Sequence, residues 1–326
     1  MRINKQKVLA GLYAFQPRSL KMGLGVSPSP SLWVKDPSGS RGSKPPTKRI
    51  NIKILSHRDN LQRLVAGDIY EVGECGQGED GRHEVDRVYV IKNGKRPLLI
   101  DSGSRIYRTS IMKSIEDILD GQTPEVLFLS HTELPHAGNV RALGDRWPGL
   151  TVVVSELVLA YLELPRYKEI KKLIYIPAGT ERAFAGRELE FMNAILRDQT
   201  TSQWILDYKT GTMFSSDAFG YYHLPGKCEL FNDEKGGATR EVDMMDFHRN
   251  AFGYLRWVIP ERFNETIDKV FENRDIKIIA PIHGNPIRSD INDHVAMLKR
   301  IIKRLRAESL GQTPVLTAVE RGGRKK

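Results

Sequence analysis

Short apolar runs alternate along the chain with longer stretches in which apolar residues recur at helical spacing. Two apolar runs within residues 87–100 flank Asn93-Gly94, the strongest short-range signal of a β-hairpin. After Ile111, apolar positions recur with the period of one helical face, which predicts an amphipathic helix. Further strands are predicted at 68–72, 126–129, 151–154, 188–192, 203–207, 212–215 and 277–282. This order of strands and helices is compatible with a β-sandwich covered by helices.

Helical patterns also follow several of these strands. Helices are predicted from Ala137, through residues 157–162 and around Ile267. The last helix should begin after Ser289, a residue type favoured at the N-cap, and it carries an apolar stripe that ends near Leu305. The predicted helices therefore have apolar faces with which to cover the sheets.

Three potential metal ligands lie within six residues directly after the apolar run 126–129. They are His131, Glu133 and His136. Two imidazoles and a carboxylate suit iron, manganese or zinc, and the absence of thiolates argues against a structural Cys-rich zinc site. The alternative interpretation is a loop with two solvent-exposed histidines.

Two later strand signals end in the same kind of residue. Asp217 follows 212–215 and precedes Gly220, and His283 follows 277–282 and precedes Gly284. A glycine allows the backbone to turn closely around a site. We therefore expect these strand ends to meet the first ligand loop.

With these segments, residues 60 to 305 resemble the metallo-β-lactamase fold, and within it the oxygen-binding diiron branch of flavodiiron proteins. Asp101-Ser102-Gly103 is similar to the family's Asp-x-Gly strand end, and residues 215–220 are similar to its bridging-aspartate motif. Hydrolases of the fold carry His-x-His-x-Asp-His in the first loop, whereas the diiron branch carries Glu at the position of Glu133. The resemblance implies an α+β fold, built as a four-layer αββα sandwich.

The resemblance also implies two sets of metal ligands. One metal would bind His131, Glu133, Asp198 and the bridging Asp217, and the other would bind His136, His283 and the same Asp217. The chain departs from the family pattern twice. Pro135 stands where the family has an aspartate, and Asp198 stands where it has a histidine.

Two more residues are candidates for a supporting role. Asp101 resembles the family's buried aspartate, which orients groups of the ligand loop by hydrogen bonds. His223 follows Asp217 closely enough to line the entrance of the site. The histidines at 57, 83, 248 and 294 are expected to be surface or structural residues.

The implied cofactor is iron, with two ions per chain, and manganese or zinc are the alternatives. The implied function is to bind or reduce oxygen or nitric oxide with electrons from a separate donor, or to sense such a gas by binding. A metal-dependent hydrolase is the second hypothesis, in which a metal lowers the pKa of bound water to about 7. A scaffold with a vestigial site is the third.

Charge divides the chain into three parts. Residues 1–50 carry a net charge of +9 and residues 299–326 carry +7, while the whole chain is +10, so the residues between them carry −6. We expect a basic, disordered extension at 1–52, a metallo-β-lactamase-like domain at 53–307 and a basic, disordered tail at 308–326. Basic tails attract phosphate non-specifically, so no specific nucleic-acid partner is expected.

The cysteine content and the other segments of the sequence restrict the expected compartment and partners of the protein. Two cysteines in 326 residues form no disulfide framework and favour a reducing compartment, so we expect a cytoplasmic protein, with organelle import by residues 1–52 as the alternative. No apolar run is long enough to cross a membrane. No flavodoxin-like or rubredoxin-like segment is recognised in this sequence, which is why the electron donor is expected to be separate. A homodimer is a further expectation, because the diiron family often places two sites across a head-to-tail dimer.

Overall fold

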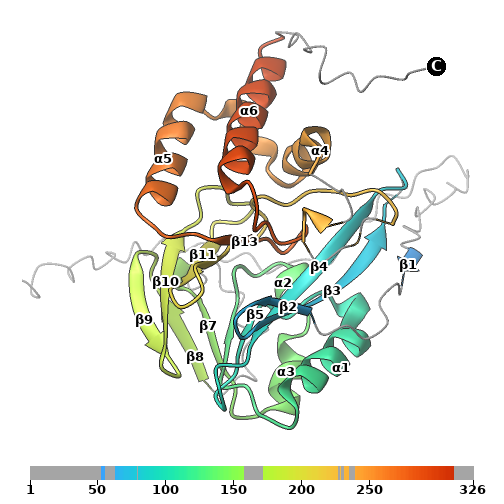
Figure 1. The fold of residues 1–326 in the computed structure, drawn as a ribbon, viewed down its shortest axis with the longest axis vertical. Coiled ribbons are helices and arrows are strands. Elements are labelled where there is room, and N and C mark those ends of the chain that lie inside the picture. Colours follow the sequence, from blue (N-terminus) through green and yellow to red (C-terminus); the bar gives the residue numbers. More distant parts are fainter. Residues whose placement is uncertain are drawn as a thin grey trace, which may run out of the picture. The chain divides into compact units, whose positions relative to one another are not determined.

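The computed structural model describes residues 53–55, 63–78, 80–157, 172–226, 228, 231–234 and 239–311. They form two β-sheets with helices outside each (Figure 1). The predicted extension at 1–52, the predicted helix at 157–162 beyond its first residue and residues 312–326 lie outside the described residues. None of the described helices has the length and apolar character that a membrane span requires.

Within the described residues, the first sheet has eight strands in the order β1-β3-β4-β5-β6-β7-β8, and β2 also pairs with β3. Strands β5, β6 and β7 are mutually parallel, with Ile100 opposite Phe128 and Phe128 opposite Val153. The strand bounds are β1 Lys53–Leu55, β2 Arg63–Ala66, β3 Ile69–Gln77, β4 His83–Ile91, β5 Leu98–Ile100, β6 Val126–Phe128, β7 Thr151–Ser155 and β8 Lys172–Ile176.

The second sheet has the order β13-β12-β11-β10-β9. Its strands are antiparallel except for the β12–β13 pair, which is parallel and places Phe214 opposite Ala280. The bounds are β9 Thr180–Phe184, β10 Arg187–Asn193, β11 Gln203–Asp207, β12 Thr212–Phe214 and β13 Ile278–Ala280. In both sheets, the predicted strands are present.

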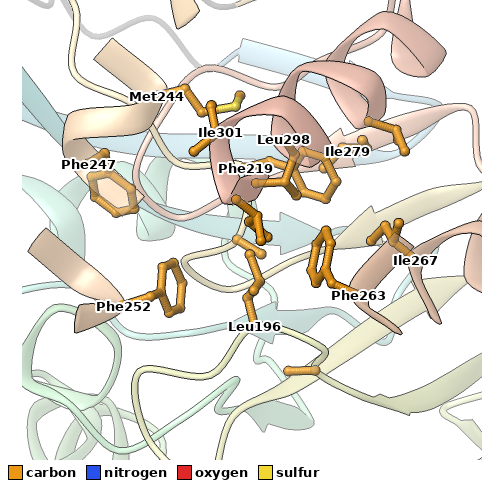
Figure 2. Close-up of a cluster of buried hydrophobic side chains, with 14 of the residues drawn as sticks. Leu196, Phe219, Met244, Phe247, Phe252, Phe263, Ile267, Ile279, Leu298 and Ile301 are labelled. Atoms are coloured by element: carbon orange, nitrogen blue, oxygen red, sulfur yellow. The ribbon is translucent and has the colours of Figure 1, made fainter. Parts of the chain in front are cut away.

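Three apolar clusters make this arrangement four layers deep. The cluster between the sheets combines residues of both, such as Tyr89, Phe128 and Phe214. The outer face of the first sheet packs on α1 (Arg108–Leu119) and α3 (Val140–Arg146), and the outer face of the second packs on α4 (Glu241–Ala251), α5 (Pro260–Glu272) and α6 (Ile291–Ser309). Figure 2 shows the cluster on the outer face of the second sheet, where Leu298 and Ile301 of α6 lie with Phe219 and Phe263. The predicted αββα sandwich is confirmed.

The helices include the predicted amphipathic stretches near Ile111, near Ile267 and after Ser289, but the helix predicted from Ala137 begins only at Val140. Their bounds are α1 Arg108–Leu119, α2 Leu134–Ala137, α3 Val140–Arg146, α4 Glu241–Ala251, α5 Pro260–Glu272 and α6 Ile291–Ser309. The prediction that Ser289 caps α6 is wrong. Asp290 occupies the N-cap with a left-handed φ of 52°, and the buried Ser289 hydroxyl has no hydrogen-bond partner among the described residues.

Candidate metal centre

The parallel strands bring the ligand segments together, because each segment follows a strand at its carboxyl end. Asp101 follows β5, His131 comes three residues after β6, Asp217 comes three residues after β12 and His283 comes three residues after β13. His136 lies on α2, whose first turn contains Pro135. Proline is tolerated there because the first amide groups of a helix have no intrahelical acceptor. The departure at Pro135 is thus compatible with the loop's path.

Three imidazoles face the carboxylate of Asp217. The Nε2 atoms of His136 and His283 lie 2.9 and 3.7 Å from Oδ1 of Asp217, and Nε2 of His131 lies 4.0 Å from its Oδ2. The rings of His131 and His136 lie 3.6 Å apart between centroids. All four side chains are buried. Asp217 therefore occupies the position between the two sets of ligands that the sequence predicted.

Asp198 and Glu133 approach the same site from the side of His131. Oδ2 of Asp198 lies 3.1 Å from Nε2 of His131, and Ser202 donates a hydrogen bond to the other oxygen of Asp198. Glu133 lies 3.7 Å from the same nitrogen, but 53% of its side chain is exposed. The four groups lie close enough to hold one metal ion, with Glu133 at the solvent side.

In each imidazole, the Nδ1 atom is engaged by a supporting group. Nδ1 of His131 lies 2.8 Å from the hydroxyl of Ser216. Nδ1 of His136 lies 2.9 Å from Oδ2 of Asp101. For His283, Nδ1 lies 3.2 Å from Oδ1 of Asp86 and 3.2 Å from Oε1 of Glu84. An imidazole that binds a metal through one nitrogen usually donates the other N–H to a carboxylate, hydroxyl or carbonyl.

The buried atoms that face the centre approach one another as close imidazole–carboxylate pairs, but among the described residues they form no well-aligned hydrogen bonds. They are Nε2 of His131, Nε2 of His136, Oδ2 of Asp198 and Oδ1 of Asp217, all buried. Buried polar atoms of this kind cost free energy unless something satisfies them. A metal cation would satisfy all four at once, so the residues present fit such a group.

Electrostatics at the site favour positive charge. Burial alone would lower the pKa of His136, but Asp217 and Asp101 raise it to about 10. Burial would likewise lower the pKa of His283, but Asp86, Glu84 and Asp217 raise it to about 10. Burial would raise the pKa of Asp217, yet the facing imidazoles hold it well below its usual range. A site with this charge pattern attracts a cation.

The structure places the two supporting candidates differently. Asp101 is fully buried and accepts hydrogen bonds from the backbone N–H and the hydroxyl of Ser130, besides facing His136. His223 instead lies beside Cys75, His83 and Cys228. Sequence reasoning missed Glu84 and Asp86, which belong to an ordinary-looking strand whose alternation directs both carboxylates to His283.

Comparison with known proteins identifies the family of this chain. A family model described as "ODP family beta lactamase" matches residues 86–284. A putative diflavin flavoprotein A 1 from Nostoc is 24% identical over 65% of this chain and 35% of its own length. The anaerobic nitric oxide reductase flavorubredoxin from Vibrio vulnificus is 24% identical over 60% of this chain and 39% of its own length.

A likeness at the level of the fold extends to solved structures. The flavodiiron protein from Giardia intestinalis aligns with a TM-score of 0.62 at 18% identity, over 77% of this chain and 60% of that chain. This chain spans about two fifths or less of the two curated relatives described above. Its match is to their β-lactamase-like part. Because the family model covers more than half of the chain, the protein belongs to the ODP family of metallo-β-lactamase-like proteins.

Proposed function

We propose that this chain is a non-haem diiron domain that binds or reduces oxygen or nitric oxide with electrons from a separate donor. One observation carries the proposal. Three Nε2 atoms converge on Asp217 while the three Nδ1 atoms are engaged by Ser216, Asp101 and the Glu84–Asp86 pair. Such an arrangement presents three aligned nitrogen ligands around a carboxylate that can bridge two ions. Relatives whose names include nitric oxide reductase and flavodiiron protein support the same class.

The residues divide into two ligand sets. His131, Asp198 and Asp217, with Glu133 at the solvent side, would hold one iron. His136, His283 and the other oxygen of Asp217 would hold the second. Bound irons would supply redox equivalents and open coordination positions for a small gas. Since Pro135 has no ligating side chain, the second set would offer a bound iron fewer protein ligands than the first.

The surrounding side chains orient the ligands and exclude water. Ser130 and Asp101 hold His136 by a network of buried hydrogen bonds. The ring of Phe247 lies 5.5 Å from that of His283 and covers one side of it. A buried, preorganised donor set holds the ligands in place and limits the access of water to a reduced site.

The first test is the iron content of anaerobically purified protein, together with an absorption spectrum before and after air. We expect about two irons per chain and an oxygen-sensitive band. The Asp217→Ala variant should lose both irons, because both ligand sets contain Asp217. The matched control is His294→Gln, since His294 is a buried histidine that contacts Asn232 away from the site. Zinc in place of iron would favour the hydrolase, and an empty site would favour the scaffold.

The second test separates reduction from sensing. Chemically reduced protein is mixed with oxygen or nitric oxide, and gas consumption is followed with an electrode. Consumption over many turnovers with an added viologen donor, lost in Asp217→Ala, supports a reductase. Binding of one gas molecule per site without turnover supports a sensor. Iron that responds to neither gas would overturn the proposal.

A further inference from the structure

A second group of metal-ligating side chains lies apart from the six residues above. Cys75, His83, His223 and Cys228 each offer one ligand atom, and these atoms all lie within 4.8 Å of one another. Cys75, His83 and His223 are buried, and Cys228 is partly buried. The diiron proposal uses none of these four atoms.

Strand register explains why they meet. Gln77 of β3 pairs with His83 of β4, so Cys75, two residues from Gln77, lies on the same face as His83. His223 forms an isolated bridge on the other side of His83, with a hydrogen bond in each direction between their backbones at 2.7 and 2.9 Å. The chain then turns through Gly226, whose φ of +79° suits glycine, and returns with Cys228.

The distances match a tetrahedral ion. Sγ of Cys75 lies 3.4 Å from Nε2 of His223, and Sγ of Cys228 lies 3.2 Å from the same nitrogen. Nδ1 of His83 lies 3.2 Å from Sγ of Cys228. Bonds of about 2.3 Å to sulfur and about 2.0–2.1 Å to nitrogen place tetrahedral ligands roughly 3.5 Å apart.

The chemistry of the donors selects the metal. Two thiols and two imidazoles form the set typical of tetrahedral zinc, whereas the first site offers only nitrogen and oxygen. Hydrogen bonds with Cys75, His223 and His83 hold the pKa of the Cys228 thiol well below its usual range, which favours the thiolate that zinc requires.

We propose that Cys75, His83, His223 and Cys228 bind one structural Zn²⁺ ion. Four protein ligands close the coordination sphere, and binding releases the thiol protons that remain. The ion would tie the β3–β4 hairpin to the segment 223–228. That segment follows Asp217, and β4 carries Glu84 and Asp86. The zinc site would therefore stabilise the positions of two segments that contribute to the first site.

The direct test measures zinc per chain in the full-length protein after dialysis against a weak chelator. We expect about one zinc in the parent and in His131→Ala, because His131 belongs to the other site. Cys228→Ser and His223→Gln should lose it while the iron per chain falls less. Zinc lost in His131→Ala but kept in Cys228→Ser would overturn the proposal.

Cobalt substitution provides a readout that does not depend on variants folding. Co²⁺ bound by two thiolates absorbs strongly in the near ultraviolet through sulfur-to-metal charge transfer, and ligands of nitrogen and oxygen alone lack that band. We expect the band in the parent and in His131→Ala, and displacement of cobalt by one equivalent of Zn²⁺. A parent without the band, or a Cys75–Cys228 disulfide in intact mass spectra of protein purified under reducing conditions, would contradict a zinc site.

Discussion

The imidazole of His136 and the carboxylate of Asp101 form a buried pair, with Nδ1 of His136 2.9 Å from Oδ2 of Asp101. The same carboxylate accepts hydrogen bonds from the N–H and the hydroxyl of Ser130, each at 2.7 Å. Asp101 thus joins β5 to the loop after β6 and directs Nε2 of His136 toward Asp217. The orientation of a proposed ligand depends on a residue that does not itself face the centre.

Asp101→Asn should weaken iron binding by about 10- to 100-fold, because loss of a supporting carboxylate typically has that effect on a metal site. Competition with a chromophoric chelator measures the dissociation constant. Asp120→Asn is the matched control, because Asp120 also has a left-handed φ, 49° against 59° for Asp101, but lies exposed after α1. Equal affinity in parent and Asp101→Asn would mean that His136 is oriented by other contacts.

Gly220→Ala should reduce iron content. A Cβ at Gly220 would lie 2.7 Å from the carbonyl oxygen of His283 and 2.8 Å from that of Asp217, so one of the two ligand segments must shift. Gly144→Ala is the control, because a Cβ there meets no atom within 4 Å among the described residues and alanine favours the helix α3. Iron per chain, measured beside the melting temperature, tests this. A variant that melts lower with full iron content would contradict a local effect on the ligands.

Arg87→Met should destabilise the fold by about 3–5 kcal/mol, because it leaves the buried Glu71 carboxylate without its ion-pair partner. Arg87 also donates a hydrogen bond of 2.6 Å to the carbonyl of Gly284, next to His283. Urea unfolding gives the free energy. Glu71→Gln combined with Arg87→Met should recover part of the loss, since no buried charge then remains.

The exposed pair Arg96–Glu125 supplies the comparison for that ion pair. Its side chains are 56% and 38% accessible, and Arg96→Met should cost far less stability than Arg87→Met because solvent screens an exposed ion pair. Similar losses at the two sites would show that burial does not govern the strength of these ion pairs.

Acid should destabilise the protein partly through His248. Burial lowers the pKa of His248 to about 4 from an ordinary value of 6.5, so the native state holds it neutral. The unfolded chain takes up the proton first, and the contribution is therefore intact above pH 6.5 and declines as the pH falls toward 4, by about 3 kcal/mol in total.

Unfolding free energies of the parent and His248→Gln between pH 7 and 4 measure this effect. The variant should show a shallower decline, because it has no imidazole to protonate. Parallel curves for the two proteins would assign the acid sensitivity to other groups.

Local sequence was sufficient for most elements and for the ligand segments. The strand signal at 126–129 and the turn signal at Asn93-Gly94 depend mainly on residues that are close in sequence. Both β6 and the β4–β5 hairpin are present where these signals predicted them. Five of the six proposed ligands were recognisable because polar residues stand out after an apolar run, whereas Asp198 was implied only by the family resemblance.

Contacts between distant segments were decided only by the tertiary structure. The cap of α6 depends on the path of the chain before it, so Asp290 rather than Ser289 occupies it. Glu84 and Asp86 carry no motif, and their role follows from the packing of β4 beside His283.

The meeting of the four side chains in the second cluster likewise depends on contacts between distant segments. Cys75 and Cys228 are separated by about half of the chain, and from sequence alone they indicated only a reducing compartment without a disulfide framework. Strand pairing is a long-range interaction whose register fixes which side chains share a face. Local hydrophobic pattern therefore determined the elements and pointed to five of the six proposed iron ligands, whereas the register of β3, β4 and residue 223 determined that two cysteines and two histidines meet.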